Sequence, residues 1–528
     1  MAPAGPMEAE ALGSTQADVV AFLSDPASYH QVERVECVET HGNLVFLAGE
    51  EAWKIKRAVV FPYMDFSTLE KRRIACSREV EINRRFGSPL YLGCVPITRS
   101  RAGRLAFGGD EAIVEWAVHM RRFEQTALLS SIARSTGILN DLAADLADLI
   151  YAAQQLAQRK SSTSGAAPMR HLAASVASTL SRSAIASADV EQLAGGLTAA
   201  IGTAAARLDA RAAEGFVRRC HGDLHLDNIV VWQGRPVLYD AIEFDEAIAS
   251  VDTLYDLAFL LMDLDRHHQR AAANVVLNRY LWRSGERLDL QGLIALPLFL
   301  ALRAAVRAMV SADRAAQRPG QTGASDLEMA RAYLAAAIDY LALPGPHLIA
   351  IGGLSGTGKT TLATSIAPRI GRAPGAIHLR TDLERKRLAG VDALEPLPAA
   401  AYTPAARRRI YRSLREKARC VLLAGQSVII DAVFAEQVAR QDFEALAREA
   451  GVPFKGLWLH AGSATLRQRV AGRSRDASDA TPEVVSRQLG GDLGPFTAQW
   501  TVVDAGGTSQ QTLAAAEAAL RDPESPTS

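Results

Sequence analysis

The segment HLIAIGGLSGTGKTT (347–361) joins an apolar run to a glycine-rich turn and decides the fold class of the C-terminal part of the chain. Its residues Gly353, Gly358, Lys359 and Thr360 form the pattern G-x-x-x-x-G-K-T. In a phosphate-binding loop, glycines let the backbone wrap around a phosphate chain, and N–H groups at the start of the next helix face its negative charge. The segment therefore predicts a strand, a phosphate-binding loop and a helix, and with them a nucleotide site.

Each residue of this loop is assigned to ATP. Lys359 is expected to reach the β- and γ-phosphates and to serve catalysis there, and the Thr360 hydroxyl is expected to bind Mg²⁺. A glycine-rich turn without a ligand is the alternative, but the apolar strand before the loop and the helix after it favour the phosphate site. The predicted ATP-binding residues of the loop are Gly353, Leu354, Ser355, Gly356, Thr357, Gly358, Lys359, Thr360 and Thr361.

Strand and helix patterns alternate after the loop, which predicts a parallel sheet with helices on its faces. The strand candidate GAIHLRTD ends in Asp382, and Arg385 follows three residues later. A carboxylate at the carboxyl edge of such a sheet can accept a proton from an attacking hydroxyl, and an arginine can hold an anionic substrate. Asp382 is therefore the predicted catalytic base, Arg385 the substrate-binding residue, and Asp431, at the end of SVIIDA, a magnesium ligand.

These motifs resemble the small P-loop kinases of the gluconate kinase and polynucleotide kinase group, over about residues 346–520. The resemblance implies that Asp382 activates the acceptor hydroxyl. It also implies that Arg469 and Arg473, in the segment RQRVAGRSRDASDA (467–480), belong to a lid over the transferring phosphoryl group. A run of arginines is by itself more often a solvated helical face, and only the phosphate loop upstream favours the lid.

A second constellation lies in the N-terminal part, where HGDLHLDN (221–228) forms the pattern H-x-D-x-x-x-x-N and PVLYD ends in Asp240. A phosphotransferase needs one carboxylate to orient the acceptor hydroxyl, and an asparagine with a second aspartate to hold Mg²⁺. Asp223 is the predicted catalytic carboxylate, and Asn228 and Asp240 are the predicted metal ligands. A transition-metal cluster of the His and Asp side chains in this loop is the disfavoured alternative.

This constellation resembles the aminoglycoside phosphotransferase-like family, which shares the protein kinase fold. The resemblance implies a lysine on an upstream strand and a glutamate on the next helix. Lys54 is chosen over Lys56 because Ala52, two residues earlier, supplies the small side chain on the same strand face. Its expected partner is Glu79, with Glu81 as the second choice. Both chosen residues are assigned to ATP binding.

The N-terminal part departs from the kinase pattern in two places. The segment THGNLVFLAG (40–49) lacks the kinase glycine-rich pattern G-x-G-x-x-G. The ATP phosphates must therefore be covered by a loop with fewer glycines. Asp240 is followed by AIEFDE, in which Glu243 and Asp245 are either additional metal ligands or solvated acids. A structural role is expected for Asp252 and Asp256.

Nearly the whole chain resembles bacterial proteins in which an aminoglycoside phosphotransferase-like domain is fused to an ATP-binding P-loop kinase domain. The expected fold is therefore an α/β multidomain protein, a bilobal kinase-like α+β domain followed by a P-loop parallel α/β domain. The motif LPGP (343–346) cannot continue a helix and marks the boundary. The predicted parts are a disordered tail at 1–15, the kinase-like domain at 16–343, a linker at 344–346, the P-loop domain at 347–520 and a disordered tail at 521–528.

Composition excludes several classes of protein. The chain of 528 residues is 48% hydrophobic and 22% charged, which excludes a largely disordered chain. Its 58 basic and 58 acidic residues balance, which disfavours nucleic acid as a partner but leaves it open. The best apolar stretch, LIALPLFLAL (293–302), falls short of the roughly 20 residues of a membrane span. Five scattered cysteines without CxxC and the lack of a signal peptide favour a cytoplasmic protein.

The leading interpretation is an ATP- and Mg²⁺-dependent phosphotransferase with two kinase-type sites that act on hydroxyl groups of small molecules, such as a sugar or a sugar acid. Basic residues at 384–387 and 407–409 favour an anionic acceptor or the 5′-hydroxyl of a polynucleotide. Alternatively, the N-terminal half senses a nucleotide or another ligand without turnover and regulates the C-terminal kinase. A third hypothesis is an ATPase switch that acts on a protein partner. Neither the acceptors nor the oligomeric state follow from the sequence.

Overall fold

The computed structural model describes residues 14–40, 42–61, 64–318, 320–342, 344–472 and 476–521. The predicted tails therefore lie almost entirely outside the described residues, apart from the start of α1 at Ser14 and the end of α19 at Arg521. The chain divides into two compact units: residues 1–138, 152–160 and 217–256 form the first, and residues 139–151, 161–216 and 257–528 form the second. This division differs from the predicted domain limits, which remain a prediction.

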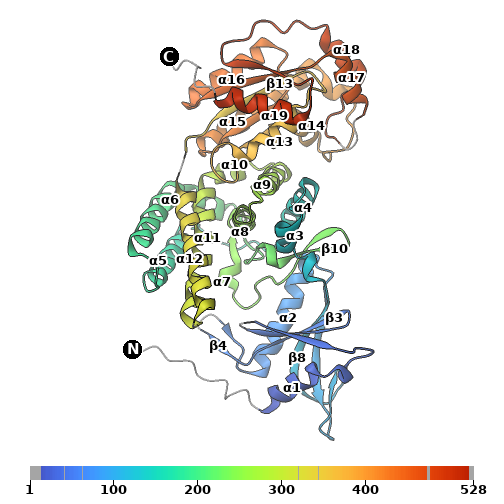
Figure 1. Cartoon of the computed structure of the whole chain (residues 1–528), viewed down its shortest axis with the longest axis vertical. Coiled ribbons are helices and arrows are strands. Elements are labelled where there is room, and N and C mark those ends of the chain that lie inside the picture. Colours follow the sequence, from blue (N-terminus) through green and yellow to red (C-terminus); the bar gives the residue numbers. More distant parts are fainter. Residues whose placement is uncertain are drawn as a thin grey trace. The chain divides into compact units, whose positions relative to one another are not determined.

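An antiparallel sheet of six strands in the order β1-β2-β3-β8-β6-β7 dominates the first unit (Figure 1). Residues 43–48 and 51–56 form a hairpin, and its left-handed turn residue is Gly49, with φ of +58°. This conformation suits glycine because it has no Cβ to clash with the backbone. The strands are β1 (Val35–Glu39), β2 (Asn43–Ala48), β3 (Glu51–Lys56), β6 (Tyr91–Arg99), β7 (Leu105–Phe107) and β8 (Ala112–Arg121).

The two faces of this sheet serve different purposes, because side chains alternate along each strand. Trp53 and Ile55 of β3 pack in the core that includes Val19 and Leu23 of helix α1 (Ser14–Ser24). On the other face, Ala52 packs with side chains of helix α2 (Leu69–Arg85). Lys54 and Lys56 share that second face, which brings both lysines to the helix that carries Glu79.

The loop segment of the kinase-like pattern lies between short strand pairs of the first unit. Strand β9 (Val217–Arg219) pairs with β12 (Ser250–Asp252), and β10 (Ile229–Trp232) forms a hairpin with β11 (Arg235–Leu238). The motif 221–228 fills the connection from β9 to β10, and Asp240 follows directly after β11. A short helix, α7 (Glu246–Ala249), begins at Asp245, whose carboxylate accepts hydrogen bonds from the N–H groups of Ala247 and Ile248.

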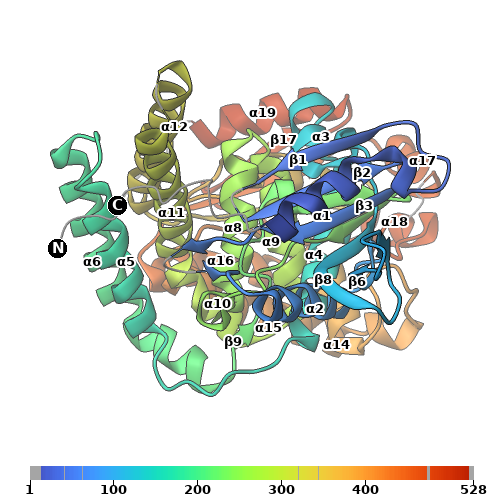
Figure 2. The same cartoon turned by 90° about the horizontal axis from the view of Figure 1, so that it is seen from below.

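The helical part of the second unit contains four long helices that lie side by side in both views (Figures 1 and 2). The helical run that contains 293–302 extends from Arg287 to Gln317, and its most apolar window of 18 residues has a mean hydropathy of 1.9. However, 72% of its most apolar window is buried inside the protein, as in a core helix. The four helices are α5 (Ala166–Leu180), α6 (Ser187–Ala213), α11 (Leu296–Gln317) and α12 (Gln321–Leu341).

Further helices of this part connect to its neighbours in sequence. Helices α4 (Asn140–Leu156) and α8 (Thr253–Arg266) each contribute residues to both compact units. Helices α9 (Arg270–Ser284) and α10 (Arg287–Gly292) belong wholly to the second unit.

The P-loop part of the second unit is built on a parallel sheet of five strands in the order β14-β15-β13-β16-β17. Such a sheet is covered by helices on both faces, which agrees with the predicted alternation. The strands are β13 (Leu348–Gly353), β14 (Ile377–Arg380), β15 (Val428–Asp431), β16 (Phe454–His460) and β17 (Trp500–Asp504). The helices are α13 (Lys359–Ile366), α14 (Thr381–Ala389), α15 (Pro404–Leu423), α16 (Gln437–Ala450), α17 (Ser463–Ala471), α18 (Pro482–Leu489) and α19 (Ser509–Arg521).

Candidate active sites

The loop between β13 and α13 has the tight geometry that its glycines predict. Gly353 and Gly356 have φ of +141° and +90°. A Cβ on Gly353 would lie 2.7 Å from the Leu459 carbonyl oxygen, and one on Gly356 would lie 2.7 Å from the Leu466 carbonyl oxygen. A side chain at either position would therefore displace the loop. Gly358, with φ of +88°, begins α13 and leaves its N-terminus open to an anion.

Three predicted residues meet at the mouth of this loop. The Thr360 hydroxyl donates to Asp431 Oδ2 at 2.5 Å, which joins the two predicted magnesium ligands although they are 71 residues apart. Lys359 Nζ donates to the Leu354 carbonyl oxygen at 3.0 Å and thus folds back over the loop. A hydroxyl and a carboxylate are oxygen donors of the kind that Mg²⁺ prefers, so this pair fits a magnesium ion that bridges to phosphates.

Asp431 lies at the end of β15 and is only 5% exposed. Burial alone would raise the pKa of this carboxyl, but His378, Arg380 and Lys359 outweigh it and hold the pKa well below its usual range. His378 Nε2 lies 3.5 Å from Asp431 Oδ2, and Arg380 Nε lies 3.7 Å from the same oxygen. The Asp431 carboxyl group is therefore ionised and suited to bind a cation. His378 and Arg380, both from β14, were not identified from the sequence.

Asp382 does not end a strand, as the sequence predicted, because β14 stops at Arg380 and helix α14 begins at Thr381. Asp382 thus lies in the first turn of α14. Its Oδ1 accepts a hydrogen bond from Arg385 at 2.7 Å, one turn further along. The guanidinium of Arg385 also stacks on the Tyr402 ring, 4.6 Å from its centroid. The predicted base and the predicted substrate-binding arginine are therefore neighbours.

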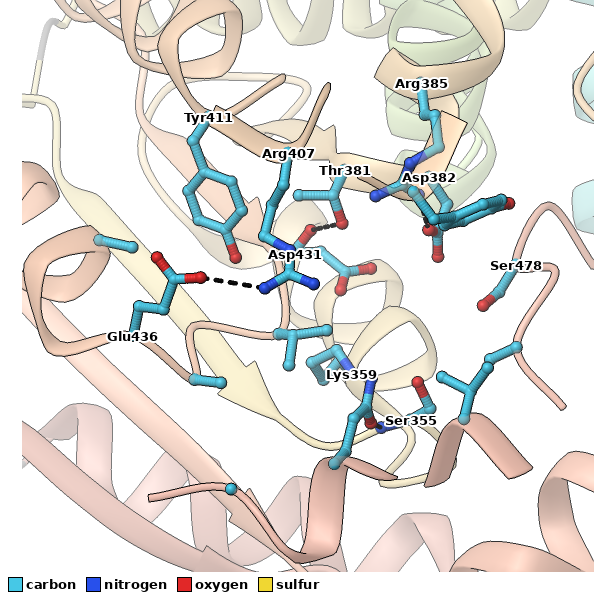
Figure 3. A pocket seen from close by; sticks show the side chains of 18 of the residues that line it. Ser355, Lys359, Thr381, Asp382, Arg385, Arg407, Tyr411, Asp431, Glu436 and Ser478 are labelled. Atoms are coloured by element: carbon cyan, nitrogen blue, oxygen red, sulfur yellow. Dashed lines mark hydrogen bonds and ion pairs between the residues drawn. The ribbon is translucent and has the colours of Figure 1, made fainter. Parts of the chain in front are cut away.

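These residues line one large cavity of about 1420 Å³. Figure 3 shows Lys359, Asp382 and Asp431 around it, together with Arg407 and Tyr411 of α15. Ligand pockets commonly measure about 300–1,000 Å³, so this cavity has room for a nucleotide phosphate chain and an acceptor together.

One wall of the cavity is formed by helix α15, which carries the basic run 407–409. Arg407 of α15 projects into the cavity and pairs with Glu436 at 2.9 Å (Figure 3). Arg408 and Arg412 also line it, and neither side chain makes a hydrogen bond or ion pair with another of the described residues. Tyr411 accepts a hydrogen bond from the N–H of Phe434, which follows β15, and burial raises the pKa of Tyr411 to about 12. Helix α15 therefore presents positive charge to the cavity.

The arginine segment predicted as a lid is described only in part, because Arg473 lies outside the described residues. Arg469 lines the cavity, but its guanidinium donates to the carbonyl oxygens of Ala505 and Gly507, both at 2.7 Å. Those hydrogen bonds hold the side chain against backbone, and a phosphate contact for Arg469 stays a prediction. The following segment is tied to α14, since Asp479 accepts from Lys386 at 2.7 Å.

In the first unit, Lys54 contacts its predicted partner Glu79 and also Asp240, which was predicted as a metal ligand. Its Nζ lies 3.0 Å from Glu79 Oε1 and 2.5 Å from Asp240 Oδ1. Lys56 occupies the next position on the same face, 2.6 Å from Glu79 Oε2 and 2.5 Å from Glu243 Oε1. Glu79 therefore bridges two lysines, whereas the alternative partner Glu81 pairs with Arg85 on the surface.

Burial and charge act against each other in this cluster. Burial alone would lower the pKa of Lys54, but Asp240 and Glu79 raise it well above its usual range. Burial would raise the pKa of Glu79, but the two lysines lower it to about 2. Glu243 is 5% exposed, and its burial raises its pKa despite Lys56. Glu243 is thus neither a solvated acid nor free to bind a metal in this conformation.

The loop 221–228 places its predicted residues side by side. Asn228 Nδ2 donates to Asp223 Oδ2 at 3.0 Å, and His225 Nε2 lies 3.2 Å from the same oxygen. The base of the loop is held by Asp256, which accepts from the Gly222 N–H at 2.9 Å. This agrees with the structural role expected for Asp256. Among the described residues, no group of three or more His, Cys, Asp or Glu side chains lies close enough together to hold a metal ion.

Asp240 adopts a left-handed conformation, with φ of +58°, which is uncommon for a residue other than glycine. Two side chains that were not identified from the sequence hold this turn. The Asp240 N–H donates to the Tyr91 hydroxyl at 3.0 Å, and the Ala241 N–H donates to Asn83 Oδ1 at 3.1 Å. Together with Lys54, these contacts aim the Asp240 carboxylate toward the face where a nucleotide is expected.

Comparisons with known proteins find a family model for the C-terminal part of the chain and relatives that cover most of it. A model of the AAA domain family (AAA_33) matches residues 348–491. The uncharacterized protein Rv2004c of Mycobacterium tuberculosis H37Rv is 30% identical over 483 residues, which cover 87% of this chain and 91% of the relative. The uncharacterized protein Mb2027c of Mycobacterium bovis matches to the same extent.

Two solved structures are similar to separate parts of the chain. A gluconokinase from Sinorhizobium meliloti 1021 is 21% identical, covers 33% of this chain and 91% of its own, and has a TM-score of 0.25. A choline/ethanolamine kinase family protein from Mesorhizobium loti is 13% identical, covers 62% of this chain and 99% of its own, and has a TM-score of 0.37. Because the two relatives are 30% identical over 87% of this chain, the chain belongs to the bacterial family that includes Rv2004c and Mb2027c, and its residues 348–491 match the AAA domain family model.

Proposed function

We propose that the protein is an ATP-dependent phosphotransferase that carries the γ-phosphoryl group of ATP to a hydroxyl group of an anionic small molecule, such as a sugar acid, at its P-loop site. The contact between Thr360 and Asp431 beside Lys359, in the cavity that also contains Asp382, carries this proposal. A magnesium ion held by Thr360 and Asp431 would neutralise charge on the phosphates. Lys359, freed from the Leu354 carbonyl, would bind the same phosphates.

The acceptor chemistry follows from the other wall of the cavity. Asp382 would accept the proton of the acceptor hydroxyl as its oxygen bonds to the γ-phosphorus and the bond from phosphorus to the departing ADP breaks. Arg385 is poised to release Asp382 and bind an anionic group of the acceptor instead. The side chains of α15 extend this positive wall, which supports an acceptor with a carboxylate or phosphate.

We propose that the N-terminal half holds a second kinase-type site of the same class, with Asp223 as the carboxylate that orients the hydroxyl. Lys54, Asn228 and Asp240 would bind the phosphates and magnesium of ATP. The left-handed turn at Asp240 supports this site, because strained backbone conformations occur mainly where function requires them. A half that binds nucleotide without turnover is the competing proposal.

The two halves are tested together by incubating the full-length protein with Mg²⁺, ATP labelled on its γ-phosphate and a metabolite extract, and then identifying the labelled products. Each site is expected to produce its own product, so Asp382→Asn should remove one product and Asp223→Ala another, each by at least about 100-fold. Products unaffected by Asp223→Ala would leave the N-terminal half non-catalytic. Label found only as free phosphate would contradict the phosphotransferase and favour an ATPase switch.

The proposed charge of the acceptor is tested by Arg407→Ala. Loss of a charge-assisted hydrogen bond to an anionic acceptor is expected to raise the KM for that acceptor about tenfold or more, with the KM for ATP unchanged. Arg409→Ala is the matched control, because Arg409 is exposed on the same helix and does not line the cavity. Equal KM values in both variants would contradict the role of this wall. A steep fall in acceptor affinity with salt for a 5′-hydroxyl oligonucleotide would favour the polynucleotide alternative.

A further inference from the structure

The outermost strand of the parallel sheet, β14 (Ile377–Arg380), pairs with β15 on one side only. The Ile377 N–H donates to the Ser427 carbonyl oxygen at 2.8 Å, so Ile377 faces the sheet. Because backbone groups alternate along a strand, the groups of Ala376 and His378 point away from it. Such an edge offers unpaired donors and acceptors that other segments can bind.

Helix α9 (Arg270–Ser284) supplies the partners of this edge with side chains. Asn278 Oδ1 accepts from the His378 N–H at 2.7 Å, and Asn278 Nδ2 lies 3.3 Å from the Ala376 carbonyl oxygen. One side-chain amide thus imitates the peptide group of a neighbouring strand. Asn274, one helical turn earlier and 3% exposed, donates to the same Ala376 oxygen at 3.0 Å. The spacing of four residues places both asparagines on one face of α9.

A third contact comes from the next turn of the same face. Trp282 Nε1 donates to the Leu383 carbonyl oxygen at 3.1 Å, in the first turn of α14. The Trp282 side chain is itself held by Arg279, whose guanidinium lies 4.5 Å from the ring centroid and pairs with Asp148 at 2.6 Å. We call Asn274, Asn278 and Trp282 the α9 bracket.

The α9 bracket contacts the chain on both sides of Asp382. Its asparagines bind the strand that leads into α14, and Trp282 binds the residue directly after Asp382. At the other end of α14, a Cβ on Gly285 would lie 3.4 Å from Arg387 Cδ, so the end of α9 also packs on α14. The position and direction of the first turn of α14 therefore depend on α9.

We propose that Asn278 and Trp282 are positioning residues of the P-loop phosphotransfer site, which hold Asp382 where it meets the acceptor hydroxyl. The rate measurement that tests this role rests on the proposed function. The α9 bracket itself is defined by hydrogen bonds in the structure and does not depend on that function. Helix α9 comes before the predicted linker at 344–346. A helix from the kinase-like half thus supports the acceptor side of the P-loop site, where Asp382 lies. The hydrogen bonds of the α9 bracket do not involve the phosphate loop.

This difference makes the proposal measurable in the full-length protein. In Asn278→Ala, the catalytic rate constant of the P-loop reaction is expected to fall about tenfold, because a displaced base loses near-attack geometry. The Kd for Mg²⁺ with a non-hydrolysable ATP analogue should change less than about twofold, since no bracket contact reaches the phosphate loop. Hydrogen exchange in the peptide 376–383, followed by mass spectrometry, should accelerate about tenfold when the His378 N–H loses its acceptor.

Two further variants make the result decisive. Trp282→Phe keeps a ring under Arg279 but removes the indole donor, and should lower the same rate constant without changing nucleotide affinity. Ala271→Asn is the control, because Ala271 is exposed on α9 and should leave every measurement unchanged. Alanine is the better helix former, so damage in Asn278→Ala cannot come from helix propensity.

Each outcome decides the proposal. Unchanged rates in both bracket variants would overturn the positioning role, as would an equal loss of nucleotide affinity, which would indicate general destabilisation. If the wild-type protein transfers no phosphoryl group, the proposed function fails. In that case the bracket is judged by exchange alone, and unaltered exchange at 376–383 in Asn278→Ala overturns it.

Discussion

Replacing Lys359 with alanine is expected to lower phosphoryl transfer at the P-loop site by about 1,000-fold or more. A fixed positive charge aimed at the transferring group is worth several kcal/mol in a site that excludes water, and little else in the loop can replace it. The Lys359 side chain donates to the Leu354 carbonyl oxygen, so its removal also breaks this hydrogen bond. The measurement is the steady-state rate of the labelled product that Asp382→Asn also removes.

The control for this experiment is Lys71→Ala, because Lys71 is a half-exposed lysine of α2 that pairs only with side chains on the surface. Its rate should match that of the wild type. Products of the N-terminal site should persist in Lys359→Ala, since Lys54 serves that site. If Lys359→Ala keeps more than about a tenth of the wild-type rate while remaining folded, the loop is not the phosphate-binding site of the reaction.

The sequence predicted the phosphate loop well because its physical requirements are local. Close approach of the backbone to phosphates requires glycine at fixed positions, and the lysine and threonine follow in the same helix turn. The pairing of Thr360 with Asp431 was also predictable, since neighbouring parallel strands bring their carboxyl ends to one edge of a sheet. Asp382 was placed on a strand because no signal in IHLRTD marks where the strand ends and the helix begins.

Contacts between residues far apart in the chain could not be predicted from the sequence. Asp240 and Tyr91 are 149 residues apart, and His378 and Asn278 are 100 apart. An asparagine that takes the place of a neighbouring strand looks in the sequence like any polar residue of a helix. The basic run 407–409 indicated an anionic acceptor, but the sequence did not show that Arg407 lines the same cavity as Asp382. For Glu243, the sequence allowed a ligand or a solvated acid, whereas the structure buries it on Lys56. Tertiary packing decides the roles of these residues, and the local sequence pattern does not predict tertiary packing.

Glu79→Gln is expected to lower the free energy of unfolding of the first unit by about 3–5 kcal/mol. Removing the carboxylate that the two buried ammonium groups share leaves Lys54 with Asp240 and Lys56 with Glu243, so two positive charges remain beside a neutral side chain. Breaking a buried ion pair by removing one partner costs more than the original pair gained. Lys56 is 1% exposed and Lys54 is 7% exposed, so neither can reach water without moving β3. The stability is measured by native-state hydrogen exchange of β2 and β3 in the full-length protein, because two compact units need not unfold together.

Glu81→Gln is the matched control, two residues along the same helix. Its carboxylate pairs with Arg85 and is 67% exposed, so its removal should change the stability of the sheet by less than about 0.5 kcal/mol. Equal stability of Glu79→Gln and Glu81→Gln would mean that the two lysines find other partners, in conflict with the cluster described here.

The pH dependence separates the charge of Glu79 from its packing. The folded-state pKa of Glu79 is about 2, below its usual value of 4.5, so the stabilisation it provides is fully present above pH 4.5 and is lost as pH falls toward 2. Glu79→Gln has no such carboxyl, so the stability difference between wild type and variant should shrink over this interval. If the difference stays constant with pH, Glu79 acts through shape and hydrogen bonding alone. If the stability difference between wild type and variant instead vanishes in acid, the ion pairs of Glu79 with Lys54 and Lys56 are what hold β3 to α2. The same ion pairs then also fix the position of Lys54 beside Asp240.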